Sequence, residues 1–204
     1  MAGAVRAGRR RDGSITRERM LEEAMTAIAE DGLAALTMSA LAERLGTSGG
    51  HILYYFGSKD LLLLAAVRWS EAALAEERRL LLARRIPVPR RLDLFLRLYL
   101  PLGPRDPRWT LWIELWARTP ANPELGEAQR ELDRGWQEDL EALLVKGVER
   151  SCFAPLDAPA RASELLALLD GLSTRVVLGQ ESVRDSRPAL DAARAAVALL
   201  IPPA

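Results

Sequence analysis

Apolar residues recur every three or four positions along most of this 204-residue chain, which is the spacing of one face of an α-helix. Gly and Pro residues interrupt this pattern at intervals and mark the expected helix ends. No segment alternates apolar and polar residues in the manner of a β-strand. The sequence therefore predicts an all-α protein of about nine helices, with approximate bounds 16–30, 38–45, 49–56, 59–84, 89–100, 107–118, 123–150, 160–179 and 188–201.

Residues 37–59 carry the signals for two short helices joined by a tight turn. Thr37 is a residue type that caps helix N-termini, and Gly46 follows the last apolar position of the first helix, where a left-handed residue is needed. Ser48 stands where it can cap the second helix. This layout predicts a helix-turn-helix, whose second helix lies in the DNA major groove.

The longer segment LTMSALAERLGTSGGHILYYFGSKDLLLLAA resembles the DNA-binding region of the tetracycline-repressor (TetR) family of bacterial transcription regulators. The resemblance lies in the helix-turn-helix, the Tyr-Tyr-Phe and Gly-Ser-Lys-Asp sequences, and the leucine-rich helix that follows. It implies an N-terminal three-helix DNA-binding domain at 15–60 and a larger helical ligand-binding and dimerisation domain at 61–204. It also implies a homodimeric repressor that binds a palindromic operator and is released by an unidentified small-molecule inducer.

The second helix of the motif carries the expected contacts to double-stranded DNA. His51 can hydrogen-bond to a base edge or a phosphate, and Tyr54 and Tyr55 can pair a hydroxyl with phosphate while their rings pack on sugar or a thymine methyl. The alternatives are that His51 is an exposed helix residue without a task and that Tyr55 packs in the core. Gly49 and Gly50 would let the helix backbone approach the DNA closely. The remaining phosphate-facing candidates are Ser39, Thr47, Ser48 and Lys59.

The formal net charge is zero, but the charge is unevenly distributed. Within residues 1–19, six Arg residues exceed the two acidic residues by four, and three Gly residues accompany them. We expect residues 1–14 to form a flexible basic arm along the DNA, with a solvated tail as the alternative. The single Cys152 and the lack of an 18-residue apolar run point to a cytoplasmic protein with no membrane partner.

Three tryptophans, Trp109, Trp112 and Trp116, share one face of the predicted helix at 107–118. In the resembling family the larger domain holds a small-molecule pocket, and an aromatic stripe can line such a pocket and bind flat or cationic compounds. The alternative is ordinary core packing. Glu114 and Arg175 are candidate polar anchors for a ligand.

The last two predicted helices carry apolar stripes at helical spacing. The resemblance implies that these helices pair with their symmetry mates in a dimer, and the alternative is that they close the core of the protomer. The expected interface residues are Leu165, Leu168, Leu169, Leu172, Val176, Leu190, Ala193 and Val197.

A different class of function is an all-helical enzyme or small-molecule sensor that contains an incidental helix-turn-helix-like corner. Enzymatic chemistry needs a nucleophile with a base, or a set of metal ligands. The chain has one histidine and one cysteine, far apart in the sequence, and no Gly-rich phosphate loop. The sequence therefore favours a regulator, with no catalytic residues, no metal and no cofactor.

Overall fold

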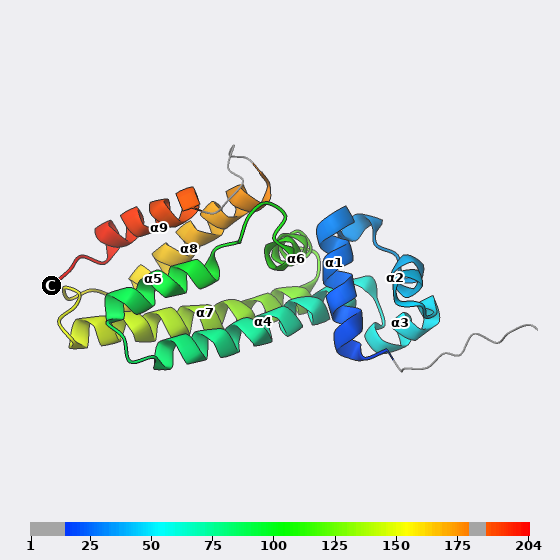
Figure 1. Cartoon of the computed structure of the whole chain (residues 1–204), viewed down its shortest axis with the longest axis horizontal. Coiled ribbons are helices and arrows are strands. Elements are labelled where there is room, and N and C mark those ends of the chain that lie inside the picture. The colour runs from blue at the N-terminus through cyan, green and yellow to red at the C-terminus, as the bar shows by residue number, and fades with distance from the viewer. Residues whose placement is uncertain (1–14, 180–186) are drawn as a thin grey trace, which may run out of the picture.

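The computed structural model describes residues 15–179 and 187–204, and within them the chain is helical, as the apolar spacing predicts. Figure 1 shows a small lobe at the N-terminal end and a long helical lobe beside it. The helices of the described residues are α1 (Arg17–Ala35), α2 (Met38–Leu45), α3 (Gly49–Phe56), α4 (Lys59–Ala83), α5 (Val88–Tyr99), α6 (Pro107–Trp116), α7 (Pro123–Glu149), α8 (Ala158–Val177) and α9 (Arg187–Leu200).

Local side chains set the ends of the first helices in the way the sequence predicts. The hydroxyl of Thr37 accepts a hydrogen bond from the Ala40 N–H at 3.0 Å, and Ser48 and Ser58 cap α3 and α4 in the same way. Gly46 has a φ of 67°, the left-handed conformation that ends α2. At Gly32 the helix breaks close to the expected stop at residue 30, but a further short helical piece extends α1 to Ala35.

The small lobe packs α1, α2 and α3 around the beginning of α4 (Figure 1). Its core contains the fully buried Met20, Ile28, Leu41 and Ile52, and Phe56 is 5% exposed. Each such side chain contributes about 1.5–3 kcal/mol by leaving water, which suffices to fix three short helices against a fourth. Phe56 therefore belongs to the core, as its place at the end of the motif predicts.

The long lobe is built on α4 and α7, which run side by side, with α5 and α8 packed against them and α9 packed on α8 and α5 (Figure 1). The short helix α6 lies where the two lobes meet and contacts α1, α4 and α8. Because α4 begins in the small lobe and extends through the long one, the expected boundary at residues 60 and 61 falls within its first turn. Among the described residues, no helix is long and apolar enough to cross a membrane.

The structure places most of the expected dimer residues in the core of the protomer. Leu165, Leu169 and Ala193 have no exposed surface, and Val176 and Leu190 are 4% and 8% exposed. They are buried because α8 and α9 pack against each other and against α7 and α5. These five side chains therefore pack in the core of the protomer, which is the alternative that the sequence left open.

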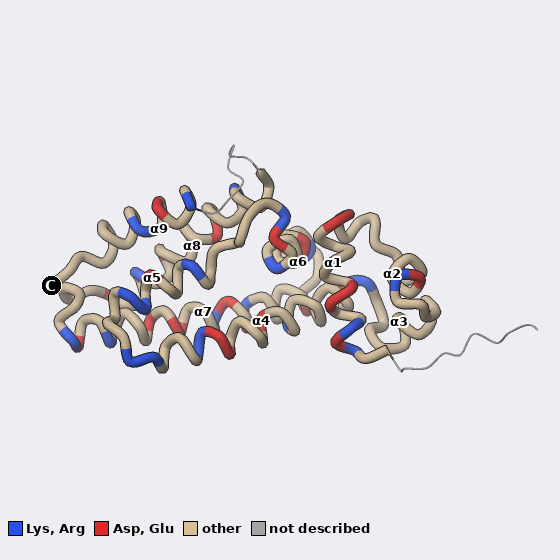
Figure 2. Tube along the Cα trace, in the orientation of Figure 1, with Lys and Arg blue, Asp and Glu red and all other residues tan. Residues whose placement is uncertain are grey.

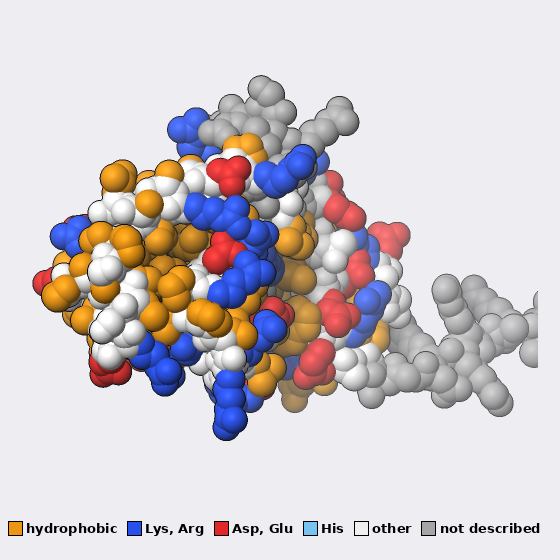
Figure 3. Space-filling model, turned by 60° about the vertical axis from the view of Figure 1, so that its left-hand side comes forward, with side chains coloured by type: hydrophobic (Ala, Val, Ile, Leu, Met, Phe, Trp, Pro, Cys, Tyr) orange, Lys and Arg blue, Asp and Glu red, His pale blue; other side chains and the backbone are white. Residues whose placement is uncertain are grey.

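The other three expected interface residues keep some surface. Leu172 and Val197 are half-buried against the same core, and Leu168 is 37% exposed. Figure 3 shows hydrophobic side chains gathered over the end of the molecule opposite the small lobe, beside a band of Lys and Arg side chains. The apolar stripe thus serves the protomer core first, and the outward faces of α8 and α9 remain for any partner.

Candidate functional site

The second helix of the motif presents aromatic side chains to solvent. Tyr54 is 85% exposed and Tyr55 is 44% exposed, whereas His51 is half-buried. The Tyr55 ring stands edge-on to both neighbours, with centroid distances of 5.1 Å to His51 and 5.7 Å to Tyr54. Tyr54 is thus an outward-pointing aromatic residue with a free hydroxyl end, as a phosphate or sugar contact requires.

The two glycines at the start of α3 differ in their surroundings. A Cβ on Gly50 would meet nothing within 4 Å, so this position leaves open space where a DNA backbone can approach. A Cβ on Gly49 would lie 3.3 Å from the Ser39 hydroxyl oxygen and 3.5 Å from the Ser39 Cα. Gly49 therefore allows α3 to pack closely on α2. This packing explains a glycine at position 49 independently of any contact with DNA.

The expected phosphate-binding side chains are also partly used inside the lobe. Lys59 donates from Nζ to the Ala34 carbonyl at 3.0 Å, at the end of α1. The Ser48 hydroxyl caps α3, Thr47 is half-buried, and Ser39 is exposed. Figure 2 shows no charged residue along α3, and the expected basic arm at residues 1–14 lies outside the described residues.

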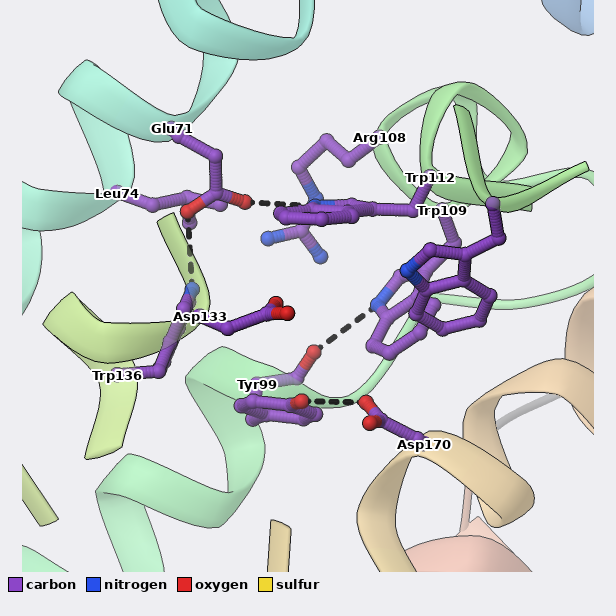
Figure 4. Close-up of a pocket in the computed structure, with 10 residues that line it drawn as sticks. Glu71, Leu74, Tyr99, Arg108, Trp109, Trp112, Asp133, Trp136 and Asp170 are labelled. Carbon is purple, nitrogen blue, oxygen red and sulfur yellow. Dashed lines mark hydrogen bonds between the residues drawn. The ribbon is translucent and has the colours of Figure 1, made fainter. Parts of the chain in front are cut away.

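A second candidate site is an aromatic pocket in the long lobe (Figure 4). The face of α6 supplies Trp109, Trp112 and Trp116, as the sequence predicts, and α7 and α5 add Trp136 and Tyr99. The Tyr99 ring centroid lies 4.7 Å from that of Trp136 and 5.6 Å from that of Trp109, in edge-to-face contacts. The two interpretations of the tryptophans, pocket lining and core packing, both hold. Trp109 and Trp112 are about 6–7% exposed, belong to the core and also line the pocket.

A buried carboxylate holds two of the indole rings. Glu71 of α4 is 5% exposed, and its Oε1 accepts the Trp112 indole N–H at 2.8 Å while its Oε2 accepts that of Trp136 at 2.9 Å (Figure 4). Arg78 balances this carboxylate from 3.7 Å, and its guanidinium carbon lies 3.8 Å from the centroid of the Trp136 ring. Arg78 itself pairs with Asp139 at 2.7 Å.

Two further carboxylates face the same space. The Tyr99 hydroxyl donates to Asp170 Oδ1 at 2.5 Å, and burial raises the pKa of the Asp170 carboxyl to about 6, with Asp133 adding to the rise and the Tyr99 hydrogen bond opposing it. Burial also raises the pKa of Tyr99 well above its usual value, so its hydroxyl stays a donor. Asp133 stands at the more solvent-exposed edge, yet burial of its inner side raises its pKa as well.

The pocket is narrow. Its enclosed part has a volume of about 20 Å³. This is room for about one water molecule, and a larger ligand must push the walls apart.

The polar anchors expected from the sequence are not part of this pocket. Glu114 lies on the other side of α6 and accepts the Leu33 N–H of α1 at 2.9 Å, and Arg175 is exposed on α8 away from the lining. The polar lining consists instead of Glu71, Arg108, Asp133 and Asp170. These residues come from α4, α6, α7 and α8, so no local motif marks them as a set. Within the described residues, no cluster of His, Cys, Asp and Glu is arranged to hold a metal ion.

Comparison with known proteins identifies the chain. Residues 20–66 match the profile of bacterial regulatory proteins of the tetR family, and residues 89–202 match that of the C-terminal region of BetI-type transcriptional repressors. This chain belongs to the TetR family, in its BetI-type branch. It is 30% identical over 193 residues to the transcriptional regulator BetI of Burkholderia cenocepacia, which covers 92% of this chain and 94% of the relative.

Solved structures agree with this assignment. A transcriptional regulator from Saccharomonospora viridis in complex with choline superposes with a TM-score of 0.83 at 26% identity, covering 91% of this chain and 96% of that one. A TetR regulator from Haloarcula marismortui shares the fold, with a TM-score of 0.76 at 23% identity over 90% of this chain and 99% of that one.

The family membership decides between the two classes of function. The chain is a ligand-responsive DNA-binding regulator of the repressor type, and the enzyme alternative is rejected because the family consists of transcription regulators. The match over residues 20–66 makes the helix-turn-helix the DNA-binding element of this regulator.

A substitution on α3 tests the expected DNA contact. We expect Tyr54→Ala to weaken binding to an operator selected from random DNA by about 1–2 kcal/mol, roughly equally across sequences, because a phosphate contact positions without specifying. Since the side chain is 85% exposed, the melting temperature should not fall. Leu80→Ala, an exposed apolar truncation on α4, is the control in fluorescence-anisotropy titrations. Unchanged DNA affinity in Tyr54→Ala would remove Tyr54 from the interface.

Proposed function

We propose that this BetI-type repressor responds to choline or a closely related small quaternary ammonium compound, which enters the aromatic pocket and releases the operator. The observation that carries the proposal is the combination of aromatic walls with carboxylates in one enclosed site. Trp109, Trp112, Trp116, Trp136 and Tyr99 supply the walls.

The chemistry of a quaternary ammonium ion fits these walls. Such an ion has no N–H group, so it cannot be held by directed hydrogen bonds and is instead attracted to the negative faces of aromatic rings. Each favourable ring contact is worth about 0.5–2 kcal/mol, more where water is excluded. Five aromatic side chains around one narrow space supply several such contacts at once.

The charges of the lining favour the same class of ligand. Three carboxylates, on Glu71, Asp133 and Asp170, line the pocket beside one cation, Arg108. Arg108 is already engaged with Asp106 at 3.3 Å and with backbone carbonyls. A bound cation would therefore stabilise these partly buried carboxylates, whereas an anionic ligand would be repelled by them. The choline complex of the Saccharomonospora viridis regulator, a protein of the same fold, supports this choice.

The carboxylate that orients two indoles offers a direct test. In Glu71→Gln the side-chain amide offers one oxygen and one N–H₂ group, so one of the two indole N–H groups of Trp112 and Trp136 faces a donor. We expect choline affinity to fall about tenfold or more, from the lost charge and the loosened ring. Isothermal titration with choline measures it. The matched control is Glu131→Gln, which makes the same change of charge at an exposed carboxylate on α7. Equal choline affinities in both variants would contradict binding in the aromatic pocket.

The pH dependence follows from the raised pKa of Asp170. With a pKa of about 6, this carboxyl is mostly protonated at pH 5 and mostly ionised at pH 7. A cation prefers the ionised form, so choline should bind more tightly as pH rises, and about tenfold more weakly at pH 5 than at pH 7 if only the ionised form binds. Asp133 is the charged group that acts on Asp170, and Tyr99 is its hydrogen-bond donor. Glu71 and Arg108 are the other charged residues that line the same pocket. Asp170→Asn should flatten the profile, and a steep profile in that variant would assign the titration to another group.

We also propose that the repressor is a homodimer that pairs the outward faces of α8 and α9 and binds a palindromic operator. Dimerisation is typical of the family. On α8 the exposed positions recur at Glu164, Leu168 and Gly171, and on α9 the exposed Ala195 and Leu199 are four residues apart. Small residues beside exposed leucines allow two helices to approach closely in a symmetric bundle.

A charge on this outward face should separate the protomers. Leu168 is 37% exposed, so Leu168→Glu costs little in a lone protomer but places two carboxylates near a twofold interface. We expect multi-angle light scattering to give a dimer for the unmodified protein and a monomer for this variant. Leu80→Glu, the same change at an exposed leucine of α4, should remain dimeric. A monomeric parent protein at micromolar concentration would rule out the dimer.

A further inference from the structure

The short helix α6 has a polar side that the ligand pocket does not use. Trp109, Trp112 and Trp116 face the pocket, and with Arg108 they make α6 the largest contributor to its lining. Glu114 lies about 140° around the helix from Trp109, given 100° per residue, and projects toward α1. One ten-residue helix is therefore both a pocket wall and a contact surface of the DNA-binding lobe.

Glu114 fulfils a specific need of α1. Gly32 has φ 80° and ψ 157°, which breaks α1 and leaves the N–H of the next residue, Leu33, without its helical acceptor. Leu33 has no exposed surface, and a buried N–H must find a partner. Glu114 Oε1 accepts it at 2.9 Å, and a Cβ on residue 32 would lie 3.6 Å from the same oxygen.

A second arm of the same network reaches the beginning of α4. Glu114 Oε2 accepts from Arg118 Nη1 at 2.7 Å, and Arg118 Nε lies 3.3 Å from Asp60 Oδ1. Next to Asp60, the Lys59 ammonium donates to the Ala34 carbonyl. The last turn of α1, which leads directly into α2, is thus fastened from α6 at Leu33 and from α4 at Ala34.

We infer that Glu114 couples the pocket to the DNA-binding lobe: when a ligand widens the pocket and displaces α6, Glu114 carries that displacement to the end of α1 and so to the helix-turn-helix. The inference rests on the proposed ligand function of the pocket. It differs from transmission along the length of α4 alone, because α6 joins the two sites directly. Glu114 is therefore a positioning residue that touches neither DNA nor ligand.

The test separates coupling from binding. An operator selected from random DNA by the unmodified protein is titrated with and without saturating choline, and choline is titrated without DNA. Ligands of regulators typically change DNA affinity by about 5–150-fold. In Glu114→Ala we expect this factor to fall to within about twofold of one, while choline affinity without DNA stays within about twofold of the parent.

Two further variants guard against a trivial loss of structure. Glu114→Gln keeps an oxygen for the Leu33 N–H but loses the charge that binds Arg118, and we expect it to keep part of the coupling. Glu131→Gln removes an exposed carboxylate and should keep all of it. Hydrogen exchange at the Leu33 amide should accelerate in Glu114→Ala and less in Glu114→Gln. Full coupling in Glu114→Ala would overturn the inference.

An experiment without ligand, in which the DNA affinities of variants are compared, distinguishes failure of this inference from failure of the proposed function. If the unmodified protein does not bind choline, the choice of ligand is wrong, and Glu71→Gln then serves as the perturbation of the pocket. We expect Glu71→Gln to change DNA affinity, and this change should disappear when Glu114→Ala is also present, as a double-mutant cycle reports. Additive effects in that cycle, or no effect of Glu71→Gln on DNA affinity, would overturn the coupling role of Glu114.

Discussion

The buried carboxylate of Glu71 is the interaction on which the long lobe depends. A carboxylate removed from water costs several kcal/mol unless partners replace its hydration. Here two indole N–H groups, from Trp112 and Trp136, and the guanidinium of Arg78 provide that replacement. Because these partners come from α4, α6 and α7, satisfying one charge fixes three helices relative to one another. The orientation of the aromatic rings toward the cavity follows from this constraint, not from shape alone.

The same arrangement leaves mainly negative charge facing the pocket. Arg78 is drawn to the outer side of Trp136 and to Asp139, while Asp133 and Asp170 face the cavity from the other walls. Burial, with Asp133 adding to it, raises the pKa of the Asp170 carboxyl to about 6. Its ionised form is therefore less favourable here than in water, and a cation beside it would stabilise that form. A quaternary ammonium ligand of the kind proposed above would do so while contacting the ring faces.

The sequence predicts the helices well because their ends are local. Thr37, Ser48 and Gly46 act through neighbours one to four residues away, and most predicted bounds lie within about two residues of those found. The end of α1 differs because Gly32 interrupts the helix without ending it: the acceptor that makes this possible is Glu114, which is 81 residues distant in the chain. No local pattern reports such a partner.

Part of the aromatic pocket could likewise be predicted from the sequence, because that part is local to one helix. The stripe of Trp109, Trp112 and Trp116 is local to one helix, so its shared face was predictable. The acidic lining comes from other helices, yet one signal was available: Glu71 and Arg78 occupy positions on α4 that continue the apolar row of Val67 and Leu74. Charged residues on a buried stripe indicate a partner elsewhere. Conversely, the five buried residues of the α8–α9 stripe show that an apolar face alone does not say whether the protomer or a second copy covers it.

The position of α6 suits the proposed coupling between a small pocket and a distant surface. Its enclosed volume is near that of one water molecule, so a ligand of several heavy atoms cannot bind without moving a wall. Among the walls, α4 and α7 are long helices that pack side by side, whereas α6 has ten residues and loop connections at both ends. The short wall α6 is also the one that packs on α1. Under the proposed function, a pocket smaller than its ligand and a short helix between two lobes would together convert ligand binding into displacement of α6, which a larger preformed cavity would not require.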